Sequence, residues 1–186
     1  MMKLGRAVLA LLVACVFLSA TARLALAGDN TIRQPGDHPN YIIEIEPHLI
    51  FGWYDGFSPG YDEGFGFGAR FTIPIVKNGF VPTINNTVGI GFGADFIYYG
   101  CGALVCNGRA ADLLSFPVVM QWNFYVAQRW SVFGEPGLSL NYASALPNTF
   151  FPNPVFELGG RYHFNEHVAL TARLGFPYFS IGVSFM

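Results

Sequence analysis

Charged residues are scarce in this chain, and no long apolar segment takes their place. Asp, Glu, Lys and Arg make up 12% of its 186 residues, about half of the roughly 25% that is typical of soluble domains. Beyond residue 27 there is no run of 18 or more apolar residues, which excludes a helical membrane protein. A basic patch is also missing, so nucleic acid is not an expected partner. A membrane β-barrel remains compatible with this composition.

Residues 1–27 have the organisation of a cleavable signal peptide. Its parts are a basic n-region (Lys3, Arg6), an apolar core (residues 7–20) and an A-x-A cleavage site (residues 25–27). Cleavage after Ala22 instead of Ala27 is an alternative, and Leu12–Cys15 also resembles a lipobox. We expect residues 28–40 to form a flexible lead-in and residues 41–186 to form one domain.

Cysteine is rare as well, with three residues in the whole chain. Cys15 belongs to the leader, whereas Cys101 and Cys106 lie in a glycine-rich loop. Exported proteins meet an oxidising compartment, so we expect Cys101 and Cys106 to form a short disulfide. A zinc site is the alternative, but two thiolates without a nearby His make a poor one. We expect no metal and no cofactor.

From Tyr41 onward, apolar and polar residues alternate with a period of two, which is typical of β-strands. Glu44, Glu46 and His48 share one parity, and Ile43, Ile45 and Leu49 share the other. The same alternation recurs in each of eight predicted strands: Tyr41–Tyr54, Phe65–Val76, Thr87–Tyr99, Leu113–Val126, Trp130–Ala143, Val155–Phe164, Val168–Phe176 and Tyr178–Met186. The fold class is therefore predicted to be all-β.

No strand charge falls on the apolar face of any of these segments. An Arg that faces lipid at the bilayer midplane costs roughly 2–4 kcal/mol, so the charged faces are predicted to line the inside of a closed transmembrane barrel. The predicted polar network of the lumen consists of Glu44, Glu46, His48, Arg70, Asp95, Gln121, Glu135, Glu157, Arg161, His163 and Arg173. Buried charges need partners, so we expect these groups to form ion pairs.

The predicted connections alternate between short and long. Residues 127–129 and 165–167 are tight turns, whereas residues 55–64, 100–112 and 144–154 are longer and rich in Gly, Pro and Asn. Bacterial barrels have short periplasmic turns and longer external loops. Two connections depart from this rule, because residues 77–86 are long and the link at Pro177 is very short. Aromatic residues near the strand ends are expected at the level of the lipid headgroups: Trp53, Trp130, Tyr142, Tyr162 and Tyr178.

Together with the start of the fifth strand (residues 130–137) and the aromatic C-terminus, this alternation resembles the small eight-stranded outer-membrane barrels. That group includes the OmpA transmembrane domain and opacity-type surface proteins. The resemblance implies an eight-stranded antiparallel up-and-down barrel in the outer membrane, surrounded by lipids and inserted by the barrel assembly machinery. By this resemblance, the C-terminal assembly signal is Phe179, Ile181, Gly182, Val183 and Phe185, followed by Met186.

The interior admits more than one function. The first hypothesis is a lumen filled with side chains in a protein with a structural or surface-interaction role, whose external loops bind an unidentified partner. A second is a narrow gated pore that prefers cations, because five carboxylates face three arginines. A lipid-modifying enzyme is a further alternative, but no catalytic constellation stands out and we expect no enzyme. A soluble lipocalin-like binder would invert the alternation and leave the apolar face in water.

Overall fold

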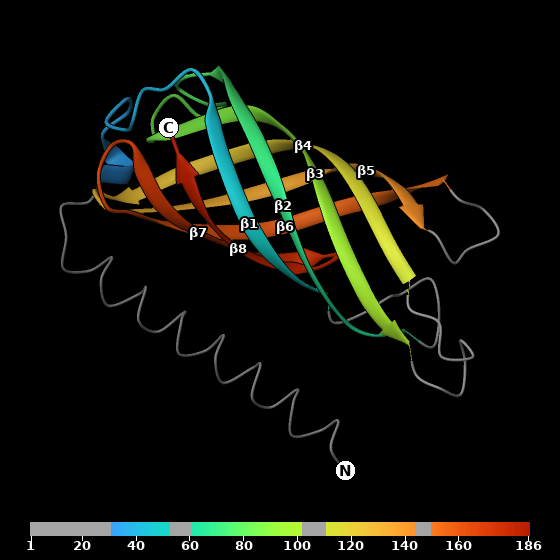
Figure 1. The fold of residues 1–186 in the computed structure, drawn as a ribbon. Coiled ribbons are helices and arrows are strands. Elements are labelled where there is room, and N and C mark those ends of the chain that lie inside the picture. The colour runs from blue at the N-terminus through green and yellow to red at the C-terminus, as the bar shows by residue number, and fades with distance from the viewer. Residues whose placement is uncertain (1–30, 53–60, 102–110, 144–149) are drawn as a thin grey trace, which may run out of the picture.

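The structure is a computed structural model that describes residues 31–52, 61–101, 111–143 and 150–186. In this part of the chain, a short 3-10 helix precedes eight β-strands (Figure 1). Their bounds are η1 Thr31–Arg33, β1 Glu44–Gly52, β2 Tyr61–Val76, β3 Asn86–Cys101, β4 Ala111–Ala127, β5 Trp130–Ala143, β6 Phe150–His163, β7 Val168–Phe176 and β8 Phe179–Phe185. No helix among these described residues is long and apolar enough to cross a membrane.

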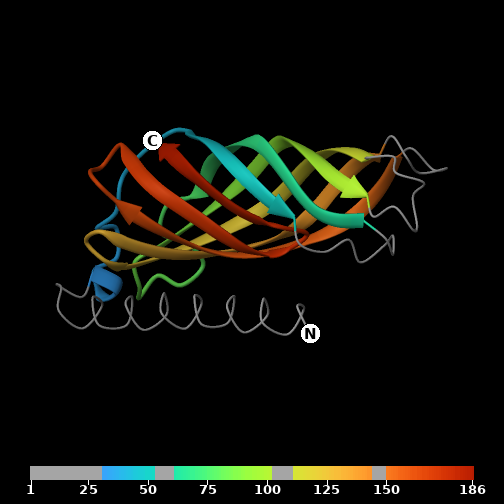
Figure 2. The same cartoon turned by 60° about the horizontal axis from the view of Figure 1, so that its bottom comes forward.

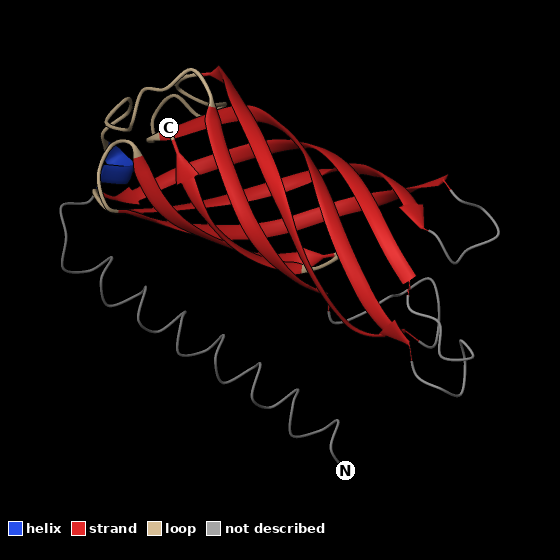
Figure 3. Ribbon diagram, viewed as in Figure 1, coloured by secondary structure: helices blue, strands red, loops and turns tan. Residues whose placement is uncertain are grey.

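The eight strands form one closed barrel, in which each strand pairs with its neighbours in the sequence. All pairs are antiparallel, and β1 closes the cylinder by pairing with β8, with Ile45 opposite Phe185 and Phe51 opposite Phe179. Strands make up nearly the whole described chain (Figure 3). The predicted eight-stranded antiparallel up-and-down barrel is therefore confirmed.

The strand bounds agree closely with the prediction for β5 and β7 and differ most for β6. This strand begins at Phe150 and not at Val155, so residues 150–154 are not part of an external loop as the sequence suggested. Their prolines indicated a loop, but the segment continues the ladder with β5 as far as Tyr142 opposite Phe150. Likewise, β2 begins at Tyr61, inside the predicted loop of residues 55–64.

The two ends of the barrel differ (Figure 2). One end, called the near end below, carries the C-terminus, η1, residues 77–85 and the turns between β4 and β5 and between β6 and β7. The other, far end carries the strand ends that lead into the predicted long loops. Most of those loops, the signal peptide and Cys106 lie outside the described residues, as does the proposed disulfide.

Residues 31–40, expected to belong to a flexible lead-in, lie against the near end in the structure. The backbone N–H of Asn85 donates to the carbonyl of Ile32 at 2.8 Å. The ring of His38 stacks on Tyr125, with 4.9 Å between the ring centroids. No sequence pattern indicates these contacts, because they join the lead-in to residues more than forty positions away.

The long near-end connection of residues 77–85 folds over the outer wall. The side-chain amide of Asn86 donates to three of its carbonyls, and Asn86 Oδ1 accepts a 2.9 Å hydrogen bond from Trp122 Nε1. The Phe80 ring packs edge-on against Trp122 at 5.5 Å. These contacts explain why a connection at this end can be longer than a tight turn and still be ordered.

Large apolar side chains cover the outside of the barrel. Phe67 is 61% exposed, Leu138 62% and Leu158 58%. Their neighbours of opposite parity are buried inside, as the β1 pattern of alternating buried and exposed residues shows. A soluble lipocalin-like barrel would have the opposite arrangement, so this alternative is wrong. The molecule is a membrane barrel, with an apolar surface that matches the hydrocarbon of a bilayer.

Candidate functional site: the polar network of the lumen

All eleven residues of the predicted polar network are buried inside the barrel, and none is more than 5% exposed. They come from β1 to β7, and ion pairs among them join strands across the lumen. Buried charges are stable only when paired and hydrogen-bonded, so the contacts of each arginine describe the site.

Arg173 connects three strands. Its Nη1 and Nη2 donate to the two carboxylate oxygens of Glu46 on β1, the second at 2.9 Å. Its Nε donates to Glu135 Oε2 on β5 at 2.8 Å. Glu46 Oε2 also accepts from Ser184 Oγ at 3.0 Å, and Ser184 bonds with Thr171 at 2.7 Å. Such a two-point guanidinium–carboxylate pair fixes both direction and distance.

Arg70 reaches the opposite wall by longer contacts. Its Nη1 lies 3.4 Å from Glu135 Oε2, and its Nη2 lies 3.6 Å from Glu157 Oε2 and 4.0 Å from Asp95 Oδ2. Glu135 also accepts from Gln121 Nε2 at 2.6 Å. Among the described residues, neither carboxylate oxygen of Glu157 has a hydrogen-bond partner. Glu135 is thus a strongly bound carboxylate, and Glu157 is a weakly bound one.

Arg161 forms a separate branch closer to the near end. Its Nη2 lies 2.6 Å from Glu44 Oε1, and its Nη1 donates to Asn123 Oδ1 at 2.9 Å. The hydroxyl of Tyr41, which precedes β1, donates to Glu44 Oε2 at 3.4 Å. Burial, followed by the charge of Glu44, raises the pKa of the Tyr41 phenol well above its usual value, so this phenol stays a donor.

Asp95 forms the third branch, toward the far end. Its Oδ1 lies 3.0 Å from His48 Nε2, and its Oδ2 accepts from the hydroxyl of Tyr178. The other ring nitrogen of His48 lies 3.2 Å from the carbonyl of Glu46. The site needs Gly68, because a Cβ there would lie 2.7 Å from His48 Nε2 and would collide with Asp95.

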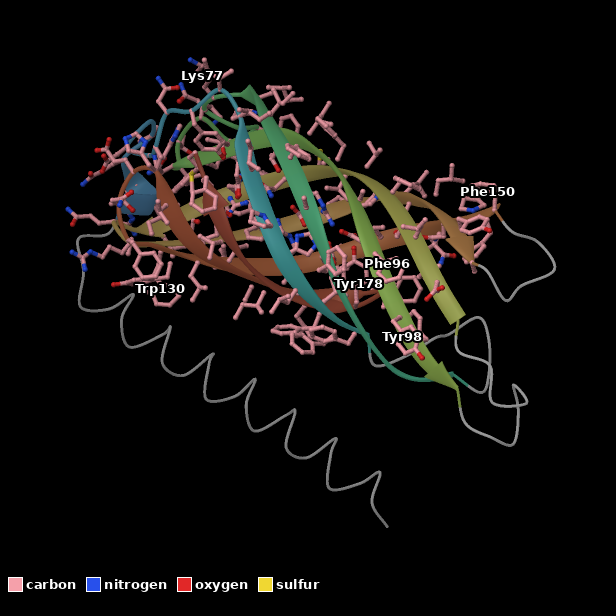
Figure 4. The ribbon with its side chains drawn as sticks, in the orientation of Figure 1. Lys77, Phe96, Tyr98, Trp130, Phe150 and Tyr178 are labelled. Atoms are coloured by element: carbon pink, nitrogen blue, oxygen red, sulfur yellow. The ribbon has the colours of Figure 1, made fainter. Side chains whose placement is uncertain are left out.

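Tyr178 was predicted at the headgroup level, and this prediction is wrong. It is 2% exposed and lies within the barrel (Figure 4). The reason is its parity, because Tyr178 precedes β8 with the same parity as the inward Ser180. The tyrosine's position near a strand end suggested the interface, whereas the alternation indicated the lumen.

Phe133 is a lumen residue that the sequence analysis missed. The Cζ atoms of Arg161 and Arg173 lie 4.6 and 5.1 Å from the centroid of its ring, which are cation–π distances. A Cβ at Gly159 would overlap this ring, so the glycine provides the space for it. Phe133 shares its parity with Glu135, and that signal could have identified it.

An apolar cluster lies between the network and the far end. Ile50, Ile97, Tyr99 and Tyr178 are buried together, and Leu113 packs against them. Side chains thus fill the lumen both at the ion pairs and beyond them.

Ser131 and His163 form a hydrogen-bonded pair beside the near end of the barrel, with 2.9 Å between Ser131 Oγ and His163 Nε2. Both side chains lie inside the wall, away from acyl chains. His163 also lines an open polar cleft of about 530 Å³ between the lead-in and the near-end turns. Within the described residues, no three His, Cys, Asp or Glu side chains gather closely enough to hold a metal ion.

The residues of the predicted assembly signal follow the wall of β8. Phe185 is 48% exposed and Gly182 is buried. A Cβ at Gly182 would lie 2.6 Å from the carbonyl of Pro47, so this glycine allows close approach of β8 to β1.

No family model and no curated protein matches the sequence. Among solved structures, the fold is similar to that of the outer-membrane protein OprG from Pseudomonas aeruginosa, with 10% identity over 80% of this chain and 97% of that chain and a TM-score of 0.47. Neisserial surface protein A is 16% identical over 78% of this chain and 97% of that chain, with a TM-score of 0.44. The attachment invasion locus protein Ail of Yersinia pestis is 12% identical over 77% of this chain and 95% of that chain, also with a TM-score of 0.44. The closed eight-stranded form of this chain is established by its own strand pairing.

Proposed function

We propose that this protein is an integral outer-membrane barrel with a filled, non-conducting lumen and a structural or surface-interaction role. The observation that carries the proposal is the position of Arg173 and Arg70, whose side chains join β1, β2, β5 and β7 across the lumen. An eight-stranded barrel is just wide enough for side chains to fill. Ion pairs that connect opposite walls therefore leave no room for a permanent water column.

Both ends of the lumen add to the closure. The cluster around Tyr178 lies toward the far end, and residues 31–40 lie against the near end. A permanent pore would need a polar path through all three layers. We therefore place the function of the protein on its surface and not in its interior.

The proposed partners follow from the same arrangement. Outer-membrane lipids contact the apolar wall, and the barrel assembly machinery recognises the C-terminal strand through Phe179, Ile181, Val183 and Phe185. An extracellular partner would bind the long connections at the far end, since barrels carry variable functions on loops held by a rigid scaffold. We propose no catalytic role, because Ser131 and His163 face the lumen.

Recording from the purified protein in planar lipid bilayers tests this proposal. We expect no conductance steps from protein whose folded state is verified by a change of gel mobility on boiling. Reproducible conductance steps from the wild-type protein would refute the filled, non-conducting lumen. Failure to insert into lipid at all would refute the membrane barrel itself.

A gated, cation-preferring pore is a second candidate, favoured by Glu157. This carboxylate is fully buried and lies 3.6 Å from Arg70, and in the part of the chain that the structure describes neither of its oxygens accepts a hydrogen bond. The lumen holds five carboxylates and three arginines, so an open path would attract cations. Under this function, the Arg70→Gln variant would show cation-selective openings more often than wild type. An equally silent variant would count against it.

A further inference from the structure

The wall of the barrel is not equally tall all around. β6 begins at Phe150, but its pairing with β7 begins only at Phe156 opposite Phe176. Two residues, Pro177 and Tyr178, then connect β7 to β8. Residues 150–155 of β6 therefore have no β7 partner. At about 3.3 Å per residue this is about 20 Å of strand, or about 15 Å along the axis at the usual tilt.

Both ribbon views show this step. In Figures 1 and 2, the β7–β8 hairpin stops well short of the far end of the barrel, which β3, β5 and β6 reach. The tall side remains apolar on its outside up to the end of its strands, where Leu140 is 50% and Phe150 is 62% exposed. On the low side, the wall ends at Phe176 and Phe179. The apolar belt is thus much shorter across β7 and β8 than across β5 and β6.

The edge of residues 150–155 that has no partner on β7 is not suited to receive another β-strand. Phe156 directs its carbonyl toward β7, since a Cβ built on Gly175 would collide with that oxygen. Alternate residues of a strand direct their backbone N–H and C=O groups to the same side. The backbone nitrogens and carbonyls of Pro152 and Pro154 therefore point to the same side as the carbonyl of Phe156, beyond the end of β7. Proline has no N–H to donate. This edge therefore disfavours pairing with a second chain.

The inner side of the step is apolar. Tyr178 lies at the step itself and turns its ring inward against Ile50, Ile97 and Tyr99. Its hydroxyl donates to Asp95, the outermost acid of the network. An apolar layer thus separates the ion pairs from whatever occupies the step. Water would gain few hydrogen bonds there.

Aromatic rings border the step on the β1 side. Phe51 contacts Phe179 at 6.0 Å and Phe65 at 5.4 Å between ring centroids. On the β6 side, Phe156 is 58% exposed. These rings continue the outer wall that faces lipid, so the border of the step has the same chemistry as that wall.

We propose that acyl chains of the surrounding bilayer fill this step and contact Phe179, Phe176 and the proline edge of β6. The proposal rests on the proposed function, because it requires that the barrel spans a membrane. The occupant is hydrocarbon because the border and the inner side are apolar, the adjoining wall already faces lipid, and the proline edge disfavours pairing with a strand. The bilayer then keeps its thickness at β7 and β8 and does not thin to the height of the low wall.

Site-directed spin labelling in phosphatidylcholine vesicles tests this proposal. Single cysteines replace Phe179 at the step, Leu158 in the middle of the wall and Tyr142 at the top of the tall wall, with Cys101 and Cys106 changed to Ser. Collisions of each label with oxygen, which concentrates in hydrocarbon, are compared with collisions with a water-soluble nickel chelate. We expect the Phe179→Cys label to resemble the Leu158→Cys label, with an oxygen-to-nickel ratio several-fold above that of Tyr142→Cys.

Two contrary outcomes are distinguishable. A nickel-accessible label at position 179 together with a lipid-exposed label at position 158 would overturn the acyl-chain proposal, because the step would then hold water or a thinned bilayer. Nickel access at both positions would instead overturn the membrane location itself. Phe176→Cys serves as a second label at the step if Phe179→Cys fails to fold, and the same reading applies.

Discussion

Arg173 on β7 binds the carboxylate of Glu46 on β1 through both of its terminal nitrogens. The two residues are 127 positions apart in the chain, and β8 lies between their strands. Because the third guanidinium nitrogen, Nε, donates to Glu135 on β5, a single side chain connects three parts of the wall. We expect the lumen to contribute to stability mainly through this residue.

Replacing Arg173 by Met should lower the free energy of unfolding by about 3–5 kcal/mol, because buried Glu46 loses its guanidinium partner and buried Glu135 loses one of its two. Urea titration of the protein in lipid vesicles, followed by tryptophan fluorescence, measures this change. Arg129→Met is the control, since Arg129 lies in an exposed turn and should change stability by less than about 0.5 kcal/mol. Equal effects of the two variants would contradict the role of the ion pairs.

Glu135 and Glu157 lie opposite each other in the β5–β6 register but differ in their contacts. Glu135 accepts hydrogen bonds from Arg173 and Gln121, whereas Glu157 accepts none from any described residue. Glu135→Gln should therefore destabilise the protein by about 1–3 kcal/mol more than Glu157→Gln. The same urea titration compares the pair, and a larger loss for Glu157→Gln would show that the network is wrongly described.

Adjacent glycines on β6 offer a test of the packing. A Cβ at Gly159 would overlap the Phe133 ring, whereas a Cβ at Gly160 would lie 3.9 Å from its nearest neighbour. We expect Gly159→Ala to cost about 1–3 kcal/mol through overpacking and Gly160→Ala to be nearly neutral. The unfolding free energies of the two variants test this prediction. Similar values would mean that the Phe133 ring moves freely to make room for the added methyl group.

The loss of stability caused by a charged residue on the outer wall should depend on how deep in the bilayer that residue lies. Leu158→Arg places a guanidinium in the middle of the apolar belt and should cost about 2–4 kcal/mol. Phe164→Arg, at the near-end border, should cost about 0–1 kcal/mol. Stability and folding yield in vesicles measure both. A soluble protein would show no such difference between the positions.

The position of residues 31–40 against the barrel should depend on the hydrogen bonds of Asn85. Its backbone N–H donates to Ile32 at 2.8 Å and its side-chain amide to Asp37 at 2.6 Å. Asn85→Ala removes the second bond, so amides of residues 31–40 should exchange hydrogen faster. Mass spectrometry of the exchanged protein measures the rate. Asn165→Ala, which affects only the turn between β6 and β7, is the control and should leave this segment unchanged.

Three features of the structure could not be predicted correctly from the sequence: the start of β6, the position of Tyr178 and the contacts of residues 31–40. The start of β6 was misjudged because Pro152 and Pro154 signal a loop locally, and only the neighbouring β5 shows that the ladder continues. Tyr178 was misplaced because its nearness to a strand end outweighed its parity. The contacts of residues 31–40 were missed because no periodic pattern encodes them.

The alternation of residues along each strand is enough to predict which side chains face inward and which face outward. Successive residues of a strand point to opposite sides, so the strand charges divide between lumen and lipid without knowledge of the barrel. The partners of these charged groups follow only from the folded barrel. Glu46 lies directly opposite Arg70 in the β1–β2 register, yet Arg70 extends toward Glu135, and Glu46 binds Arg173. Closure of the sheet and the stagger of its strands bring distant segments to one level, and a two-residue repeat contains no information about that level.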